Sequence, residues 1–271
     1  YVEKMVEVFR EVKRVLKDDG TLWLNLGDSY NGSGKAGNKD SEYFKKHTEF
    51  GKPAKNRDKI GMPTNVEGLK PKDLVGIPWR VAFALQADGW YLRQDIIWHK
   101  PNPMPESVTD RCTKSHEYIF LLTKSAKYFY DADAIKEKAT WVEERPSGME
   151  RNAAAYRDKV KYSDSSYGGG GTSLHGHSGN YKANGERINP DGMRNKRDVW
   201  RINTRPYPDA HFAVFPEEIP TLCIKAGSKE GDIVLDPFFG SGTTGWVAQR
   251  LGRRWIGIEL NNEYIALANK R

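Results

Sequence analysis

The sequence predicts an α/β protein in which helices alternate with the strands of a mostly parallel sheet. At the start of the chain, apolar residues recur at helical spacing over residues 2–16, and an apolar strand follows at residues 21–26. Near the other end, residues 232–236, 243–251 and 255–259 have the patterns of a strand, a helix and a strand joined by short links. Such a unit is typical of a right-handed parallel crossover.

The middle of the chain adds a helix and a pair of strands. Residues 71–89 carry apolar side chains at helical spacing, while β-branched and aromatic residues gather at 91–99 and 117–123. We expect these two strands to pair as an antiparallel hairpin at the edge of the sheet. Residues 216–226 predict one more helix before the closing crossover.

Length and charge limit the class of protein. The 271 residues suit one large domain with an insertion, or two small domains. The net charge of +7 favours a polyanionic partner, because cations placed on phosphates release condensed counterions. The two cysteines, Cys112 and Cys223, have neither metal-ligand nor disulfide spacing, which fits a reducing cytoplasm. No apolar run approaches the roughly 20 residues that span a bilayer. We therefore expect a cytoplasmic protein without a membrane partner.

Two polar stretches interrupt the pattern. From residue 31 to about residue 70, glycine, lysine and polar residues dominate without periodicity, which is typical of a long loop over a surface or a ligand. Between about residues 127 and 200, arginine, tyrosine, serine and glycine replace aliphatic residues, which indicates an inserted basic segment. The sequence thus predicts residues 1–137 and 201–271 as two parts of one domain, with an insert over 138–200 between them.

The most informative stretch is a strand that runs through a glycine turn into a helix, residues 233–245 (IVLDPFFGSGTTG). Such a turn brings ligands to bare backbone amides. About twenty residues beyond Gly240, at the end of the next strand, Glu259 can accept hydrogen bonds from both hydroxyls of a ribose, which implies an adenosine-containing cofactor. The same turn also suits tight strand-to-helix packing, or a nicotinamide enzyme. A nicotinamide enzyme is disfavoured, because its fold needs further strand-helix units after the acidic residue.

The segment Asp236-Pro237-Phe238-x-Gly240-Ser241-Gly242-Thr243-Thr244, followed by Ile256-Gly257-Ile258-Glu259-Leu260-Asn261, closely resembles the cofactor motifs of the N4-cytosine/N6-adenine DNA methyltransferases. The resemblance implies a Rossmann-like, S-adenosyl-L-methionine-dependent methyltransferase fold with an inserted target-recognition region. It assigns cofactor binding to Asp236, Phe238, Gly240, Ser241, Gly242, Thr243, Thr244, Glu259, Leu260 and Asn261.

A further cofactor segment of this family precedes the glycine turn, and residues 211–216 (HFAVFP) resemble it. In the family this segment lies along the methionine moiety of the cofactor. The resemblance therefore assigns binding to His211, Phe212, Phe215 and Pro216. The alternative is a helix start with a hydrophobic staple.

Residues 90–103 (WYLRQDIIWHKPNP) resemble the strand and loop that border the family's pocket for an extruded base. Extrusion is required because an enzyme cannot reach an amino group inside a stacked duplex. Trp98 is a candidate either for stacking on the base or for the core of the domain. Lys100 and Asn102 are candidates to hold a phosphate or the edge of the base.

The basic insert over 138–200 occupies the place of the family's target-recognition region, which implies double-stranded DNA as a partner. Arginine can read guanine edges bidentately, and Arg187, Arg194 and Arg197 are the candidate contacts. A solvated insert without a DNA role is the alternative. His175 and His177 have no cysteine partner, so no metal site is expected. The resemblance also allows a homodimer and a restriction enzyme as partner.

The catalytic motif of the family is the feature that the sequence lacks. Methylation of an amino nitrogen needs acceptors for the amino hydrogens, and family members supply an Asp, Asn or Ser followed by two prolines and an aromatic residue. No such tetrapeptide occurs in the sequence. The closest match is the strand-end segment 27–31 (GDSYN), in which Asp28 and Tyr30 are candidates for catalysis or for lining the pocket.

In the subgroup whose catalytic motif comes first, the catalytic strand precedes a helix and a strand like residues 2–26. That strand would lie between strands 232–236 and 21–26, and a gap of one parallel strand is not stable. We therefore expect an N-terminally truncated product or a separate segment that completes the sheet, and no direct hydrogen bonding between these two strands.

Other functions stay open in the sequence. Methylation at C5 of cytosine is disfavoured, because neither cysteine follows a proline. A catalytically silent DNA-binding or regulatory subunit with a methyltransferase fold is the main alternative from a different class, and RNA is a third possible substrate.

Overall fold

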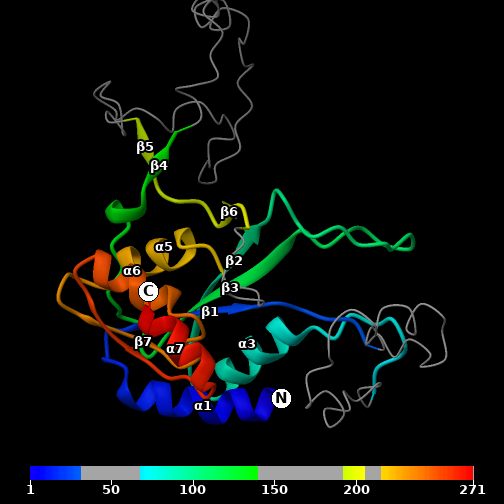
Figure 1. Ribbon diagram of the computed structural model, residues 1–271, viewed down its shortest axis with the longest axis horizontal. Helices are drawn as coiled ribbons and strands as arrows, with labels where there is room; N and C mark the ends of the chain where they lie inside the picture. The colour runs from blue at the N-terminus through cyan, green and yellow to red at the C-terminus, as the bar shows by residue number, and fades with distance from the viewer. Residues whose placement is uncertain (32–67, 140–191, 205–214, 271) are drawn as a thin grey trace, which may run out of the picture. The chain divides into compact units, whose positions relative to one another are not determined.

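The computed structural model describes residues 1–31, 68–139, 192–204 and 215–270 (Figure 1). It divides into two compact units, residues 1–130 together with 198–271, and residues 131–197. The first unit holds the main sheet and its helices, and the second interrupts it in the sequence. None of the described helices is long and apolar enough to cross a membrane.

The main sheet has four strands in the order β1-β3-β2-β6: β1 (Thr21–Leu26), β2 (Tyr91–His99), β3 (His116–Thr123) and β6 (Val199–Arg201). The antiparallel hairpin predicted from the sequence is confirmed, since β2 pairs with β3 from Tyr91 opposite Thr123 to His99 opposite His116. The hairpin lies further inside the sheet than expected. β1 flanks β3, and the three residues of β6 pair in parallel with the end of β2.

Helices cover both faces of this sheet (Figure 1). The apolar stripe of α1 (Val2–Val15) packs with α3 (Ile77–Ala87) against alternate residues of β1 and β3, including Leu24 and Phe120. On the opposite face, α5 (Glu218–Gly227) places the buried Cys223 against Trp98 and Ile119. The alternation of side chains along a strand thus produces two apolar layers.

The helix α3 begins later than the sequence suggests. The pattern predicted a helix from residue 71, whereas the structure has a turn there and starts the helix at Ile77. Gly76 has a φ of 74°, in the left-handed region that favours glycine, and Pro78 lies in the first helical turn, where its missing N–H is no disadvantage. Leu74, which we assigned to the helix, instead forms an isolated bridge with Tyr30.

A second, two-stranded sheet carries the predicted crossover. β7 (Ile233–Asp236) and β8 (Arg254–Gly257) pair in parallel, joined by α6 (Thr243–Arg250), and α7 (Asn262–Lys270) closes the chain. The apolar side chains of α6 pack with those of α5 and β7, among them Val247, Ile224 and Val234. The strand-helix-strand unit expected from the sequence is therefore confirmed.

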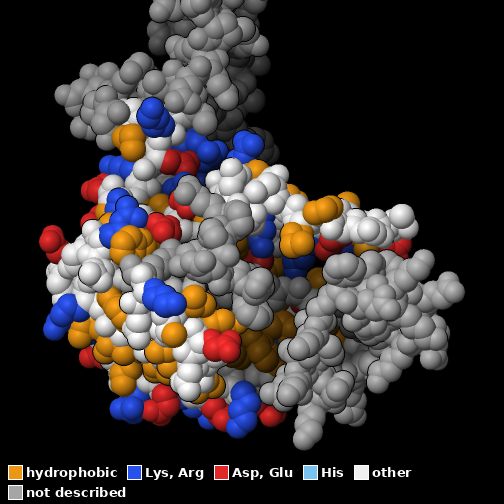
Figure 2. Space-filling view, in the orientation of Figure 1, with side chains coloured by type: hydrophobic (Ala, Val, Ile, Leu, Met, Phe, Trp, Pro, Cys, Tyr) orange, Lys and Arg blue, Asp and Glu red, His pale blue; other side chains and the backbone are white. Residues whose placement is uncertain are grey.

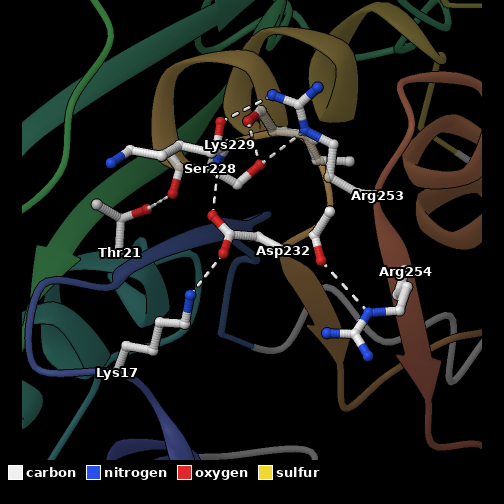
Figure 3. Close-up of polar contacts among 10 residues, drawn as sticks. Lys17, Thr21, Ser228, Lys229, Asp232, Arg253 and Arg254 are labelled. Atoms are coloured by element: carbon white, nitrogen blue, oxygen red, sulfur yellow. Dashed lines mark hydrogen bonds and ion pairs between the residues drawn. The ribbon is translucent and has the colours of Figure 1, made fainter.

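The strands β1 and β7 begin at the same edge. Figure 3 shows Lys17, just before β1, directed at Asp232, just before β7, with 2.5 Å between Nζ and Oδ1. At the same end, Thr21 Oγ1 lies 3.5 Å from the carbonyl oxygen of Gly227. Both strands start here and both line one cavity along their length, so they run in the same direction. Their carboxyl ends, at Leu26 and Asp236, therefore lie together at the opposite edge.

The strands β1 and β7 do not pair with each other. Within the described residues β1 pairs only with β3, and β7 only with β8. A cavity of about 770 Å³ lies between them, lined from one side by Leu22 and Leu24 and from the other by Val234 and Leu235. The gap predicted between these strands is thus confirmed. We call this cavity the inter-strand slot.

The second unit is described only over residues 131–139 and 192–197. A 3-10 turn, η1 (Asp133–Ile135), precedes β4 (Glu137–Lys138), which pairs with β5 (Met193–Arg194). Glu137 ties this ladder together: one oxygen accepts from Nε of Arg194 at 3.0 Å and from Nε of Arg197 at 2.6 Å, and the other accepts from Lys196 at 3.1 Å. These contacts hold the pKa of Glu137 below its usual range despite its burial.

Candidate active site

The predicted site residues come to one edge of the sheet. β1, β2 and β6 run parallel to one another and β8 runs parallel to β7, so that all five strands end at the same edge as the glycine turn. In open α/β sheets, ligands bind in the crevice outside the carboxyl ends of the strands. The candidate cofactor residues follow β7 and β8, the candidate base residues follow β2, and the inter-strand slot lies between β7 and β1.

The glycine turn after β7 is shaped by its own side chains. Asp236 accepts one hydrogen bond from the N–H of Phe238 at 2.9 Å and another from Oγ1 of Thr244 at 2.6 Å. Gly240 and Gly242 have φ angles of 53° and 82°, which favour glycine. A Cβ at Gly240 would meet nothing nearer than 4.0 Å, so a ligand can approach this backbone closely.

Phe239 is a residue of the turn whose role the sequence did not reveal. Its ring stacks on Trp255 with 5.0 Å between centroids. A Cβ placed on Gly257 would lie 2.3 Å from this ring, and one placed on Gly245 would lie 2.6 Å from it. The two glycines therefore make room for the ring, which fixes the turn against β8 and α6. The sequence did contain an indication of this packing, because the two glycines that make room for the ring, Gly245 and Gly257, lie within the motif segments.

Glu259 connects the glycine turn to the loop after β8. Its Oε2 accepts from the N–H of Gly240 at 2.8 Å, and its Oε1 accepts from the N–H groups of Leu260 at 2.9 Å and Asn261 at 2.8 Å. These backbone donors hold the pKa of Glu259 below its ordinary value, so the group is anionic at neutral pH. A carboxylate has about four acceptor positions, of which three are used. Within the described residues, one position stays open to a ligand hydroxyl, rather than the two positions expected from the sequence.

Apolar side chains flank the turn and are open to solvent. Phe238 is 55% exposed and Leu260 is 97% exposed. Figure 2 shows hydrophobic side chains among charged ones on the face of the molecule that carries α7. Ser241, in contrast, is buried, and its Oγ has no hydrogen-bond partner among the described residues. An ionised carboxylate, an unsatisfied hydroxyl and exposed apolar groups together suit an adenosine-bearing ligand.

The residues predicted to contact the target base lie at the same sheet edge, on the side of β1 that faces away from β7. We call this part the base side. The carboxylate of Glu117, at the start of β3, is ion-paired with Nζ of Lys100 and accepts a hydrogen bond from Nδ2 of Asn25 at 3.2 Å. The ammonium of Lys100 also lies 4.3 Å from the ring centroid of Trp98. Asn25 of β1, Glu117 of β3 and Lys100, which follows β2, thus form a polar network at this edge.

A family model described as DNA methylase, N6_N4_Mtase, matches residues 1–270. The chain belongs to this N6/N4 DNA methylase family. It is 48% identical to the Type II methyltransferase M.SmaI of Serratia marcescens and 46% identical to M.Cfr9I of Citrobacter freundii. Each match covers all of this chain, and 73% and 71% of the respective relative.

Solved structures show the same methyltransferase fold. The cytosine-N4-specific PvuII DNA methyltransferase aligns with a TM-score of 0.59 and 17% identity, over 99% of this chain and 69% of that protein. A putative DNA modification methylase of Thermus thermophilus, solved in complex with S-adenosyl-L-methionine, aligns with a TM-score of 0.52 and 21% identity over 100% of this chain and 75% of that protein. The family of this DNA methylase uses S-adenosyl-L-methionine as its methyl donor, as expected from the sequence.

The structure places only part of the cofactor set predicted for this DNA methylase. His211 and Phe212 lie outside the described residues. Pro216 is buried, and its carbonyl accepts the N–H of Ile219 at the start of α5. Phe215 lines the inter-strand slot. The remaining predicted residues gather at the ends of β7 and β8, where their roles in binding the cofactor stay predictions.

On the base side, the structure favours local structural roles for two candidates. Trp98 is 4% exposed, and its Nε1 donates to the carbonyl of Ile202 at 2.9 Å, so the core alternative for this residue is favoured over base stacking. Asn102 exchanges hydrogen bonds with the backbone of Thr204, at 3.1 Å from its Nδ2 and 2.9 Å to its Oδ1. Arg187 lies outside the described residues, and Arg194 and Arg197 are paired with Glu137.

Asp28 has a structural partner that the sequence did not suggest. Its Oδ1 accepts from the N–H groups of Ser29 at 2.8 Å, Gly76 at 2.9 Å and Ile77 at 3.0 Å, and so caps the N-terminus of α3 from a distant loop. Oδ2 makes no hydrogen bond within the described part of the chain. Tyr30, the other catalytic candidate, lies with its ring 4.0 Å from the guanidinium carbon of Arg111.

Substitutions of Asp28 separate its role as a helix cap from a role in catalysis. Asp28→Ala removes the acceptor for three backbone donors, so we expect unfolding to become easier by about 1–2 kcal/mol and the melting temperature to fall by a few degrees. Asp28→Asn keeps an acceptor and is expected to melt near the wild type. If Asp28→Asn keeps its melting temperature but loses methyl transfer, Oδ2 has a catalytic role. If Asp28→Ala melts like the wild type, the capping role is wrong.

Proposed function

We propose that this DNA methylase transfers the methyl group of S-adenosyl-L-methionine to the exocyclic amino group of an adenine (N6) or a cytosine (N4) flipped out of double-stranded DNA. The observation that carries the proposal is the position of the inter-strand slot. The cofactor residues end β7 on one side of it, and the base-side residues follow β1 and β2 on the other. A base entering from the β1 side therefore meets a cofactor held at the β7 side.

The chemistry needs few groups from the protein. When bound, S-adenosyl-L-methionine would supply an electrophilic methyl group on a sulfonium. The amino nitrogen would bond to the methyl carbon in line as the carbon–sulfur bond breaks and a neutral thioether leaves, and the amino group would lose one proton. Glu259 would hold the adenosine part, with the exposed side chains of Phe238 and Leu260 beside it. Acceptors for the amino hydrogens would free the nitrogen lone pair from conjugation with the ring.

The inter-strand slot suggests a position for the acceptors of the amino hydrogens. Both of its walls are strand edges whose outer backbone groups have no strand partner within the described residues. A further strand between β1 and β7 would pair with both edges and would end beside the glycine turn. We expect the acceptors on that strand, with Asp28 Oδ2 as the candidate within the described residues. A silent DNA-binding subunit is the second candidate function, because the sequence lacks the family tetrapeptide.

Partners follow from the same proposal. The relatives are named Type II methyltransferases, which implies a restriction enzyme of matching specificity and action on the cell's own DNA in the cytoplasm. The basic composition of the insert over 138–200 supports contact with the DNA backbone. A homodimer is compatible with these features and is tested by measuring the mass in solution.

Expression of the full-length protein in a host without adenine or cytosine amino methylation tests the proposed function. We expect digested host DNA to contain N6-methyladenine or N4-methylcytosine by mass spectrometry, and the methylated nucleoside identifies the base. Methylation-sensitive long-read sequencing then gives the recognition site. The matched control is Glu259→Ala, which is expected to give much less product. The enzymatic proposal fails if purified protein transfers no labelled methyl group to any DNA, and DNA binding without transfer would favour the silent subunit.

A further inference from the structure

The cations at the base-side edge differ in how they are paired. Lys100 is ion-paired with Glu117. Arg111 is paired with Glu106 at 2.6 Å and also donates to the carbonyl of Cys112. A charge that is already compensated by a neighbouring carboxylate attracts a ligand anion weakly, because the local field of the pair largely cancels. These two residues are therefore suited to holding the loop rather than to holding DNA.

Lys114 lies in the same place without such a partner. It stands two residues before β3, next to Ser115, whose carbonyl accepts the N–H of Lys100 at 2.7 Å. Its own N–H donates to Glu106 at 3.2 Å, which fixes the backbone. Its ammonium makes no hydrogen bond or ion pair within the described residues, and the residue is half-buried.

Burial lowers the pKa of Lys114 from its ordinary value, and the nearby ammonium of Lys100 adds to this effect. Three carboxylates face it and raise the pKa: Asp28 from the loop after β1, Glu117 from β3 and Glu106 from the loop before it. All three already accept from other donors: Glu117 is paired with Lys100, Glu106 with Arg111, and Asp28 accepts from three backbone N–H groups. Lys114 is thus a partly desolvated cation beside a site, and it has no ion pair with any residue that the structure describes.

We propose that Lys114 contacts a backbone phosphate of the strand that carries the target base, and that Lys100 is a positioning residue held by Glu117. The proposal rests on the proposed function. A partly buried ammonium is favourable where a ligand brings the missing anion. In the DNA that this protein is proposed to bind, every nucleotide carries such an anion, its phosphate.

The carboxylate of the cofactor is the other anion that could reach this edge. Its binding turn follows β7, whereas Lys114 precedes β3, which is separated from β7 by the slot and by β1. With strands about 4.8 Å apart and room for one strand in the slot, this distance is roughly 14 Å. A phosphate flanking a base that enters over β1 is the nearer partner.

The test compares Lys114→Gln with wild type in full-length protein. The probe is a fluorescent duplex of about 24 base pairs that carries the methylated site, or a random duplex if the wild type methylates nothing. We expect Lys114→Gln to weaken binding about tenfold at low salt. The plot of log affinity against log salt concentration is expected to become shallower by about 0.9, the value for one phosphate contact. Lys114→Arg keeps the charge and is expected to keep the slope.

Lys124→Gln is the matched control, because Lys124 is also half-buried and follows the other end of β3, where it contacts Leu16 and Asp18. It is expected to leave the salt slope unchanged. An unchanged slope in Lys114→Gln overturns the proposal, and so does weaker binding of S-adenosyl-L-methionine, measured by calorimetry, with normal DNA binding. Failure of the proposed function has a different signature, since wild type itself would then transfer no methyl group.

Discussion

Glu259→Ala is expected to weaken binding of S-adenosyl-L-methionine by about 100-fold. The substitution removes the anion assigned to the ribose, and a hydrogen bond to a charged group contributes about 1.5–3 kcal/mol, or one to two powers of ten in affinity. It also leaves the N–H groups of Gly240, Leu260 and Asn261 without their acceptor, so the glycine turn loses its connection to the loop after β8. The loss of the ribose contact and the loss of the backbone connection both weaken the cofactor site.

Isothermal calorimetry with S-adenosyl-L-methionine measures this effect. Glu263→Ala is the matched control, because Glu263 lies nearby in the first turn of α7 and its side chain makes no hydrogen bond or ion pair with the residues that the structure describes. It is expected to bind as the wild type does. A Glu259→Ala protein that binds within twofold of wild type would show that the ribose assignment is wrong.

The protonation of Glu259 also makes the stability of the fold depend on pH. Its pKa is held below the ordinary value of 4.5 in the folded protein by the N–H of Asn261, and then by those of Gly240 and Leu260. A group with a depressed folded pKa stabilises the fold above its unfolded pKa, and this contribution is lost as the pH falls through the folded pKa. The difference in unfolding free energy between wild type and Glu259→Gln should therefore be constant from about pH 5 to 8 and shrink below about pH 4.5.

Phe120→Ala is expected to reduce the free energy of unfolding by about 3–5 kcal/mol, since it removes a fully buried aromatic ring and leaves a cavity. Phe120 is 0% exposed in the middle of β3. Its ring lies 5.1 Å from that of Trp79 in α3 and 5.9 Å from that of Tyr118. A loss of this size lowers the melting temperature by roughly 10 °C in a domain of this length.

Thermal and urea unfolding of the purified variants measure this stability. Phe83→Ala is the comparison, because Phe83 also packs on Trp79, with 5.4 Å between centroids, but is 55% exposed. Its expected loss is below about 1 kcal/mol. Equal losses in the two variants would contradict the position of the core between α3 and β3.

Local sequence patterns were sufficient to predict most of the helices and strands and the turn assigned to the cofactor. Apolar periodicity predicted α1 to within a residue, and the bounds of β1 and β2 agree with the structure. These signals are local, because burial of one face of a helix or strand leaves a repeat in the sequence. The start of α3 was predicted six residues too early, because its cap comes from Asp28 rather than from a neighbour in sequence.

The sequence by itself determined the family, the cofactor and the gap between β1 and β7, since each depends on a contiguous motif or on the order of elements along the chain. Only the tertiary structure decided how side chains are paired. Lys100 and Lys114 look alike in sequence, but Glu117 comes from another strand and is ion-paired with only one of them. Trp98 lies in the core because α5 covers its face of the sheet. Such pairings join residues far apart in the chain, and a single sequence carries no local pattern for them.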